Sequence, residues 1–451
     1  MEEKDLHHKS ATYFDAICLD VAWSVFIERR LVAMNSVARN VRLYPWYIFF
    51  RDCLFWGPAF FLYFTSVLPL SQALWLESIY YISVAVLEVP SGYASDRLGR
   101  KPTLLLSALS LTIAYVLFFL GGEFWVFATA QVLLALGFAC ASGTDTALHF
   151  ESLKALGRED EYVAREARAL KYSFVAGAVG ALAGGALAMK SFELVYAASA
   201  LAGVAAMGTL ALFGEPATET KPSVQGFVRL VPQLLRKSWG KNLRFFMLFS
   251  VAMTMMVHFP YEFYQPYLER LTLPETFSAT FSGGNTPLVT GVHLAATMLL
   301  GSWSTRFVVP LRNSCSIRYA LLGCLVFQVV LVGLMALLIH PAVAVLLLSR
   351  TASKAISTPI VNGEVAPQLV KSERGTYLSI QSLLGRLCYG GVLIVMPLAA
   401  SFFSSQFQGV LVSAFVVGLV LLGIVYISPF PNRAAVSRGN PHQTTVADKA
   451  A

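Results

Sequence analysis

Twelve apolar runs, each long enough to cross a membrane as a helix, constrain the fold of this chain more than any other feature. A helix needs about 20 residues to cross ~30 Å of hydrocarbon. The runs cover residues 45–67, 72–94, 102–121, 124–147, 168–189, 193–213, 243–268, 286–308, 316–339, 341–363, 375–399 and 406–428. Only 13% of the 451 residues are charged, about half the share in a soluble domain. The sequence therefore predicts an all-α membrane protein with twelve transmembrane helices.

Lysine and arginine gather in alternate connections between the runs, which predicts the orientation of the helices. One set of connections and ends holds Arg39, Arg42, Arg97, Arg100, Lys101, Arg158, Arg165, Lys237, Arg312 and Arg433. The other set has only Lys190 and Arg270. Short basic loops stay in the cytoplasm. We therefore expect both termini and the central loop to be cytoplasmic, with the helices in the inner (plasma) membrane of a bacterium.

The longest hydrophilic connection divides the predicted helices six and six. The expected parts are an extension at 1–44, a half at 45–213, a central loop at 214–242, a half at 243–428 and a tail at 429–451. Residues 1–33 differ in character from the rest, and Met34 would be a more natural first residue.

An internal repeat relates the two halves. Glu151, Arg158 and Gly177 recur as Glu364, Lys371 and Gly390, each shifted by 213 positions. Such repeats predict two pseudo-symmetric six-helix halves that rock against each other around a central site.

The connection between the second and third runs carries a motif of glycines and charges. Its defined positions are Gly92, Asp96, Arg97, Gly99, Arg100 and Lys101. The segment resembles the GxLADRxGRK loop of the major facilitator superfamily, from which Ala94 and Ser95 depart mildly. The resemblance covers nearly everything from about Met34 to about Asn432, and it implies that this loop latches the two halves in the outward-facing state. The alternative is a plain basic anchor at the cytoplasmic surface.

The chemistry of the loop suggests partners for its charges. Asp96 is placed to cap or pair with the N-terminus of a neighbouring helix. Arg97 would pair with Asp145 or Glu151 at the end of the fourth helix.

Ionisable residues inside the runs are site candidates because burying them is costly. The substrate or proton pathway is predicted to include Asp52, His258, Tyr261, Glu262, Gln265, Arg350, Lys354 and Arg386. His258, Glu262 and Gln265 share one helix face, and the alternative there is an aromatic belt at the outer surface. Arg350 and Lys354 would bind an anion or approach Glu262; the alternatives are snorkelling for Lys354 and a structural pair for Arg386.

Further polar residues in the runs have structural interpretations. We expect Arg51 to snorkel, Glu88 to be structural, and Glu77 and His293 to be satisfied packing residues. The glycines of 180–185 match either an antiporter signature without its proline or a face of small packing residues. The family's arginine in the fourth helix is replaced by Leu133, which questions the usual route of proton coupling.

The resemblance implies a proton-coupled secondary transporter of a small organic solute, with export in the manner of drug:proton antiporters. Uptake of an organic anion and a receptor without flux are the alternatives. We expect no enzyme, no cofactor beyond the proton gradient as energy source, and no metal site, since the six cysteines form no CxxC pair. The expected partners are a small-molecule substrate and the lipid bilayer, with no nucleic acid, and the protein is expected to be a monomer.

Overall fold

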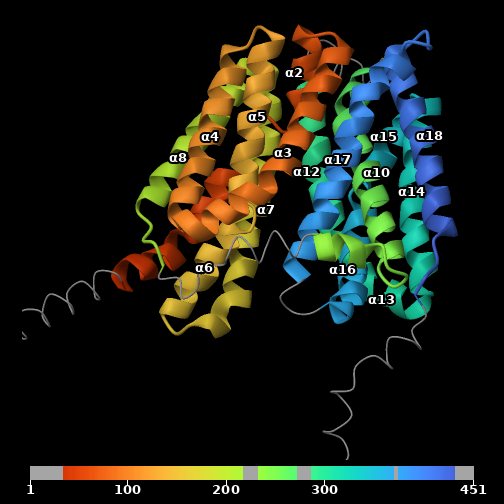
Figure 1. The fold of residues 1–451 in the computed structure, drawn as a ribbon. Coiled ribbons are helices and arrows are strands. Elements are labelled where there is room, and N and C mark those ends of the chain that lie inside the picture. Colours follow the sequence, from red (N-terminus) through yellow and green to blue (C-terminus); the bar gives the residue numbers. More distant parts are fainter. Residues whose placement is uncertain (1–33, 217–231, 272–285, 370–373, 432–451) are drawn as a thin grey trace, which may run out of the picture.

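A computed structural model describes residues 34–216, 232–271, 286–369 and 374–431. The predicted extension up to residue 33, Lys371 of the repeat, and the tail from residue 432 lie outside these ranges, as does part of the central loop. The described chain consists of helices and their connections, arranged as two bundles side by side (Figure 1).

The amino-terminal bundle begins with a helix at 34–52 that already contains Pro45, so the first helix starts earlier than predicted. It continues with α2 (Phe60–Val67), α3 (Leu70–Leu98), α4 (Arg100–Leu120), α5 (Phe124–Ala141), α6 (Thr144–Ala155), the short η1 (Glu159–Glu161), α7 (Tyr162–Ala188) and α8 (Phe192–Ala211).

A short helix at 232–238 precedes the carboxy-terminal bundle. This bundle contains α10 (Arg244–Glu269), α12 (Thr286–Ser304), η2 (Thr305–Phe307), α13 (Val308–Ser314), α14 (Ile317–Leu337), α15 (Pro341–Leu347), α16 (Ala352–Val365), η3 (Ala366–Gln368), α17 (Arg374–Ala400) and α18 (Gln406–Ile427).

Within the described ranges, nine helical segments are long and apolar enough to cross a membrane. The other three predicted spans are also present. The first is the helix at 34–52 with α2, the eighth is α12, and the tenth is α15 with α16. The first and tenth are each interrupted, so neither forms one long helix. The prediction of an all-helical membrane protein in two six-helix halves is confirmed.

Three spans are broken inside the bundle: the first at residues 53–59, the fourth at 142–143 and the tenth at 348–351. In the fourth, Gly143 adopts a φ of 73°, which glycine reaches without steric cost. A broken helix is tolerated at membrane depth only where it is buried in protein or lines a cavity. The first and tenth breaks contain buried residues, Cys53 and Arg350, whereas Ser142 and Gly143 in the fourth are exposed.

The internal repeat is visible as two equivalent ion pairs. Arg100 contacts Glu151 at 3.0 Å in the first half, and Arg312 contacts Glu364 at 3.0 Å in the second. Glu151 and Glu364 are the two residues that the repeat aligned, so their matching partners support the pseudo-symmetry.

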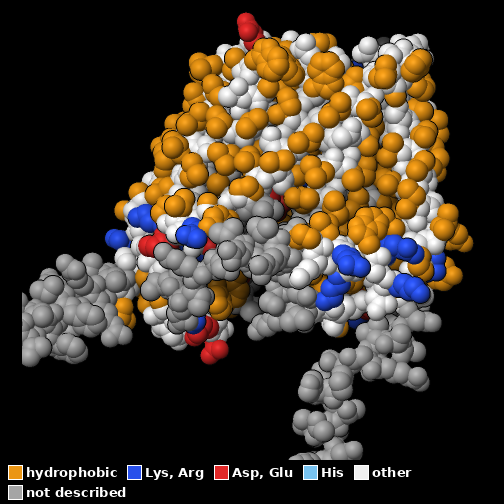
Figure 2. Space-filling model, in the orientation of Figure 1, with side chains coloured by type: hydrophobic (Ala, Val, Ile, Leu, Met, Phe, Trp, Pro, Cys, Tyr) orange, Lys and Arg blue, Asp and Glu red, His pale blue; other side chains and the backbone are white. Residues whose placement is uncertain are grey.

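The two ends of the bundle differ in charge. Lys and Arg side chains gather at the lower end in Figure 2, which carries Arg97, Arg158 and Arg312 and which we call the basic end. We call the opposite end, with the connections 121–123, 189–191 and 401–405, the far end. Both termini of the described chain lie at the basic end.

The halves pack tightly against each other near the far end. Ser78 of α3 donates a hydrogen bond to the Gly390 carbonyl of α17 at 2.8 Å. On the other side of the interface, a Cβ on Gly291 of α12 would come within 2.3 Å of the Ala181 carbonyl oxygen of α7. The halves are therefore closed at the far end in this conformation.

The glycines of α7 also allow the backbone of the broken first span to pack closely against this helix. A Cβ on Gly184 would lie 1.9 Å from the carbonyl oxygen of Phe55, in the break of that span. Gly180 approaches the backbone of Leu54 in the same way, with distances of 3.0–3.1 Å. Close packing of small residues thus accounts for this glycine pattern.

We predict that Gly184→Ala destabilises the protein, because the added methyl group would overlap backbone that has no side-chain freedom to yield. Overpacking of this kind typically costs about 1–3 kcal/mol. Gly177→Ala on the same helix is the matched control, since nothing lies within 4 Å of its Cβ position and alanine favours helix by up to about 1 kcal/mol. Thermal unfolding in detergent should place the two variants on opposite sides of the parent, and equal midpoints would contradict the packing argument.

Candidate functional site

A cavity of about 210 Å³ lies between the two halves. The first half contributes side chains from the break in the first span and from α2, α3, α4, α5 and α8, and the second half contributes side chains from α10 and α17. Because both halves form its walls, a rocking motion of the halves would change its shape and its access.

Two buried carboxyl groups face this cavity. Glu262 of α10 is 1% exposed and accepts a hydrogen bond from the Tyr81 hydroxyl of α3 at 2.5 Å. Its second oxygen, Oε2, has no hydrogen-bond partner among the described residues. Glu77 of α3, also buried, accepts a weak hydrogen bond from the Gln131 amide at 3.5 Å. An isolated carboxylate is very costly in such a place unless it is protonated or meets a cation.

Aromatic rings form most of the remaining wall. They are Trp56, Phe60, Phe64, Tyr80, Tyr81, Phe118, Tyr196 and Tyr261. Phe60 and Tyr261 stack across the two halves with ring centroids 5.9 Å apart. The Trp56 Nε1 and Tyr196 hydroxyl groups have no hydrogen-bond partner in the described chain. The wall can therefore offer ring faces and a few polar atoms to an organic solute.

The cationic side chains lie on the basic-end side of the carboxyl groups. Arg386 of α17 lines the cavity and pairs with Glu88 of α3 at 3.0 Å. Lys354 of α16 is exposed and does not line this cavity. Glu88 thus has the structural role expected for it, and Arg386 makes the structural pair that was its alternative interpretation.

The structure divides the group predicted on α10. His258, Tyr261 and Glu262 line the cavity. The aromatic-belt alternative is wrong for Glu262, which is buried. Gln265 is buried too, but it contacts the broken first span: its Oε1 accepts hydrogen bonds from the Phe61 and Leu62 amides at 3.0 and 3.3 Å.

Gln265 therefore caps a helix. The first amides of a helix have no partner within it, and Phe61 and Leu62 belong to the first turn of α2. The Gln265 Nε2 also donates to the Gly57 carbonyl at 3.0 Å. This residue joins the two halves at the far-end side of the cavity, and its predicted place in the substrate pathway is corrected accordingly.

Arg350 does not approach Glu262, contrary to our expectation. It is 1% exposed in the break between α15 and α16, where its Nη1 donates to Thr297 at 2.7 Å and its guanidinium lies 4.1 Å from the Tyr264 ring centroid. Tyr264 is two residues after Glu262, hence roughly 200° around the helix axis. Arg350 consequently packs against the side of α10 that faces away from the cavity. His293 contacts Arg350 Nη1 at 2.9 Å, as a satisfied packing residue.

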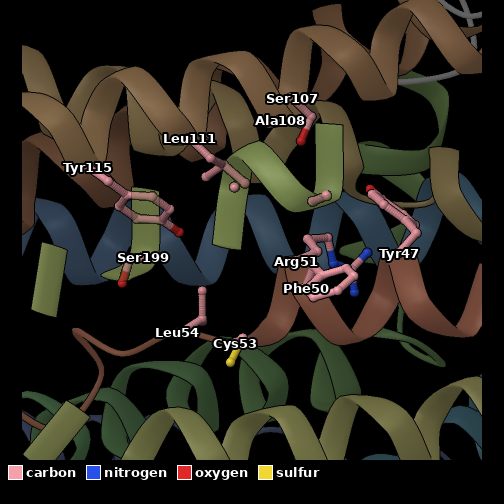
Figure 3. A pocket seen from close by; sticks show the side chains of 12 residues that line it. Tyr47, Phe50, Arg51, Cys53, Leu54, Ser107, Ala108, Leu111, Tyr115 and Ser199 are labelled. Atoms are coloured by element: carbon pink, nitrogen blue, oxygen red, sulfur yellow. The ribbon is translucent and has the colours of Figure 1, made fainter. Parts of the chain in front are cut away.

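Asp52 belongs to an ion-pair cluster inside the first half. Arg51 contacts Asp52 at 2.7 Å and also pairs with Asp145 of α6. Arg51 therefore does not snorkel, and Asp145 does not join the loop motif. Figure 3 shows this region, where the lining side chains leave a cavity of only about 10 Å³. Such a space is too small for a solute. Asp52 itself lines neither this space nor the cavity between the halves, and its place in the pathway stays a prediction.

The loop motif forms contacts different from those predicted. Arg100, rather than Arg97, bridges Asp96 at 2.6 Å and Glu151 at 3.0 Å. Arg97 is exposed and lies 5.5 Å from the ring centroid of Tyr93. The i, i+4 spacing of Asp96 and Arg100 explains the exchange, since it brings both to one face of the turn.

A residue outside the motif caps the third span. Glu215, after α8, accepts hydrogen bonds from the amides of Arg100 and Lys101 at 2.6 and 2.7 Å. This cap replaces the one expected from Asp96. Gly99, with a φ of 109°, leaves room for the Glu215 carboxylate, whose Oε1 lies 2.7 Å from the position of a Cβ.

Comparison with known proteins identifies the family. The model of the Major Facilitator Superfamily matches residues 47–389. The chain belongs to the major facilitator superfamily. It is therefore a transporter and not an enzyme, and it handles small-molecule substrates in a membrane. No curated protein is significantly similar to it in sequence.

Solved transporters share its fold at low sequence identity. The nucleoside transporter NupG is 15% identical with a TM-score of 0.67, covering 86% of this chain and 98% of its own. The peptide transporter POT in complex with sulfate is 14% identical with a TM-score of 0.64, covering 86% and 94%. A D-xylose-proton symporter is 15% identical with a TM-score of 0.61, covering 88% and 98%. These likenesses show the fold, and the drug:proton antiporter group is not distinguished by them.

We predict that Arg100→Gln destabilises the transporter while Arg97→Gln does not. The first change leaves Glu151 and Asp96 without their shared cation, and hydrogen bonds to charged groups are typically worth about 1.5–3 kcal/mol. The second removes an exposed charge, for which about 0.5 kcal/mol is the usual limit. Thermal unfolding in detergent distinguishes the two variants. A larger loss of stability in the Arg97 variant would contradict the assignment of Arg100 as the bridging residue.

Proposed function

We propose that this transporter exchanges protons for a small organic solute that carries a positive charge, and that it exports the solute. Glu262 and Glu77 would bind either protons or the cationic group of the solute. Alternation of access between the two ends would come from rocking of the halves around the cavity.

The single observation that carries this proposal is the unpaired Glu262 carboxyl in an aromatic cavity. A buried carboxylate needs a proton or a cation, and aromatic faces attract cations as well. The lining residue Arg386 already pairs with Glu88. An amine-bearing solute would therefore meet both the charge and the rings that it needs.

Exchange follows from competition for the same carboxyl groups. If the solute and the protons occupy Glu262 and Glu77 in turn, each crossing of the solute in one direction is followed by protons in the other. An inward proton gradient would then drive export from the cytoplasm. The conformation closed at the far end supports a cavity that loads from the basic end.

Uptake of an organic anion is the second candidate, and the contacts favour it less. Arg350 lies in the carboxy-terminal half behind Tyr264, and Arg386 is neutralised by Glu88. Lys354 alone of the three predicted cations would favour an anion. A receptor without flux differs from both candidates in that solute would not accumulate at all.

We expect Glu262→Gln to abolish accumulation driven by a pH gradient, because the amide cannot release a proton. Exchange of solute across the bilayer should persist at reduced affinity, since Glu77 and the rings remain. Proteoliposomes with an imposed pH gradient, loaded with panels of organic cations and anions, measure both activities. Glu269→Gln, an exposed site on the same helix, is the matched control and should transport as the parent does.

Normal accumulation by the Glu262 variant would exclude it as the coupling group. Accumulation of anions rather than cations by the parent would favour the second candidate. Absence of both flux and exchange in the parent, with solute still bound, would favour the receptor.

The direction of transport requires the basic end to face the cytoplasm. Reporter fusions after Phe213 and after Ser428, which end the two halves, should both report a cytoplasmic position because basic connections are retained there. A periplasmic signal at either position would reverse the proposed orientation.

A further inference from the structure

A second cavity, of about 650 Å³, lies at the basic end of the amino-terminal half. It is separate from the cavity between the halves, and no lining residue is shared. Five arginines line it: Arg39, Arg42, Arg158, Arg165 and Arg168. No carboxylate is among its described lining side chains. The cavity is therefore suited to an anion.

Two helices present the same side-chain pattern to this cavity. The pattern is Arg39, Arg42 and Trp46 on the helix at 34–52, and Arg165, Arg168 and Tyr172 on α7. Positions i, i+3 and i+7 lie on one helix face. Both helices run from the basic end toward the far end, so the arginines share one level and the aromatic rings lie one turn deeper. The Trp46 and Tyr172 rings meet edge to face at 5.3 Å.

Most of the positive charge is not neutralised. Arg39, Arg42 and Arg168 form no ion pair with any described residue. Glu161 contacts Arg158 at 2.6 Å and Arg165 at 2.8 Å. These hydrogen bonds lower the pKa of Glu161 to about 2, so it stays ionised and competes with a ligand for two of the five arginines.

His149 supplies a further unused polar atom. Its side chain lines the cavity, is 1% exposed and stacks on Tyr44 at 4.0 Å. Its Nδ1 lies 2.9 Å from Glu166, while its Nε2 has no hydrogen-bond partner in the described chain. A buried ring nitrogen without a partner is unusual, so this atom is open to a polar group of a ligand.

We propose that this cavity binds the phosphate of an anionic phospholipid headgroup. Arginines match phosphate oxygens in geometry and charge, and basic pockets between membrane helices at the cytoplasmic side suit such headgroups. Trp46, 47% exposed, and Tyr172 mark the boundary between headgroups and acyl chains, where these residue types concentrate. Arginines at the headgroup level with rings one turn deeper fit a lipid that enters from the side.

The test compares lipid binding by the whole transporter and by two charge-matched double variants. Arg39→Gln with Arg168→Gln removes two cavity arginines that pair with nothing described. Arg306→Gln with Arg318→Gln removes two arginines from the basic end of the other half, where the guanidinium groups lie over the Trp303 and Tyr426 rings. Native mass spectrometry with phosphatidylglycerol and phosphatidylcholine in mixed micelles measures the affinity and the number of bound lipids.

We expect the parent to bind phosphatidylglycerol in preference to phosphatidylcholine. One arginine near an anionic surface contributes a factor of roughly five in affinity, so the cavity variant, which lacks two, should lose about 25-fold. The other double variant should keep the affinity of the parent. Glu161→Gln should tighten binding, because it releases Arg158 and Arg165.

Equal losses in the two double variants would overturn the proposal, since they would indicate attraction to charge without a site. The proposal would also be wrong if both double variants kept the preference of the parent for phosphatidylglycerol over phosphatidylcholine. Free glycerol phosphate distinguishes a lipid from a soluble ligand. If it stabilises the parent but not the cavity variant, and the parent shows no preference between the two lipids, the ligand is a soluble phosphate ester.

Discussion

Every backbone group that leaves a helix within a membrane must find a partner in the protein, and this requirement organises the structure. Three spans are broken, and their free amides and carbonyls need close neighbours. Glycines on α7 let that helix touch the backbone at Leu54 and Phe55. Gln265 then supplies hydrogen bonds to the start of α2. Of the three breaks, only that of the first span contributes a lining side chain, Trp56, to the cavity between the halves.

Charge is distributed according to the same constraint. Within the first half, Arg51 has carboxylate partners in Asp52 and Asp145. Within the second half, Arg350 donates to Thr297 through Nη1 and lies against the Tyr264 ring, while its Nε and Nη2 have no hydrogen-bond partner among the described residues. The carboxyl groups of Glu77 and Glu262 lie instead at the interface between the halves. Side chains that are satisfied inside one rigid half remain so when the halves move, whereas groups at the interface change surroundings with each cycle.

The sequence predicted the architecture well, because apolar length and basic loops are local properties that a membrane imposes directly. Helical spacing also placed His258 and Glu262 on one face, and both line the cavity between the halves. The prediction failed where a partner comes from a distant helix. Arg350 and Gln265 have the residue types expected of a substrate pathway, but their side chains point away from the cavity. Arg350 contacts Thr297 and Tyr264, and Gln265 contacts the start of α2. The place of Glu77 in the cavity wall and the cap made by Glu215 were not predicted for the same reason, although Glu77 and Tyr81, one turn apart on α3, were a usable signal.

The cap that Gln265 places on α2 has a consequence for the tightness of the membrane. It joins groups of both halves, so the far end cannot open without releasing the Phe61 and Leu62 amides and the Gly57 carbonyl together. Each unpaired buried group costs about 1–3 kcal/mol, which makes a half-open state rare. In the proposed cycle the far end would therefore open as a unit, which would suppress a continuous water path across the membrane.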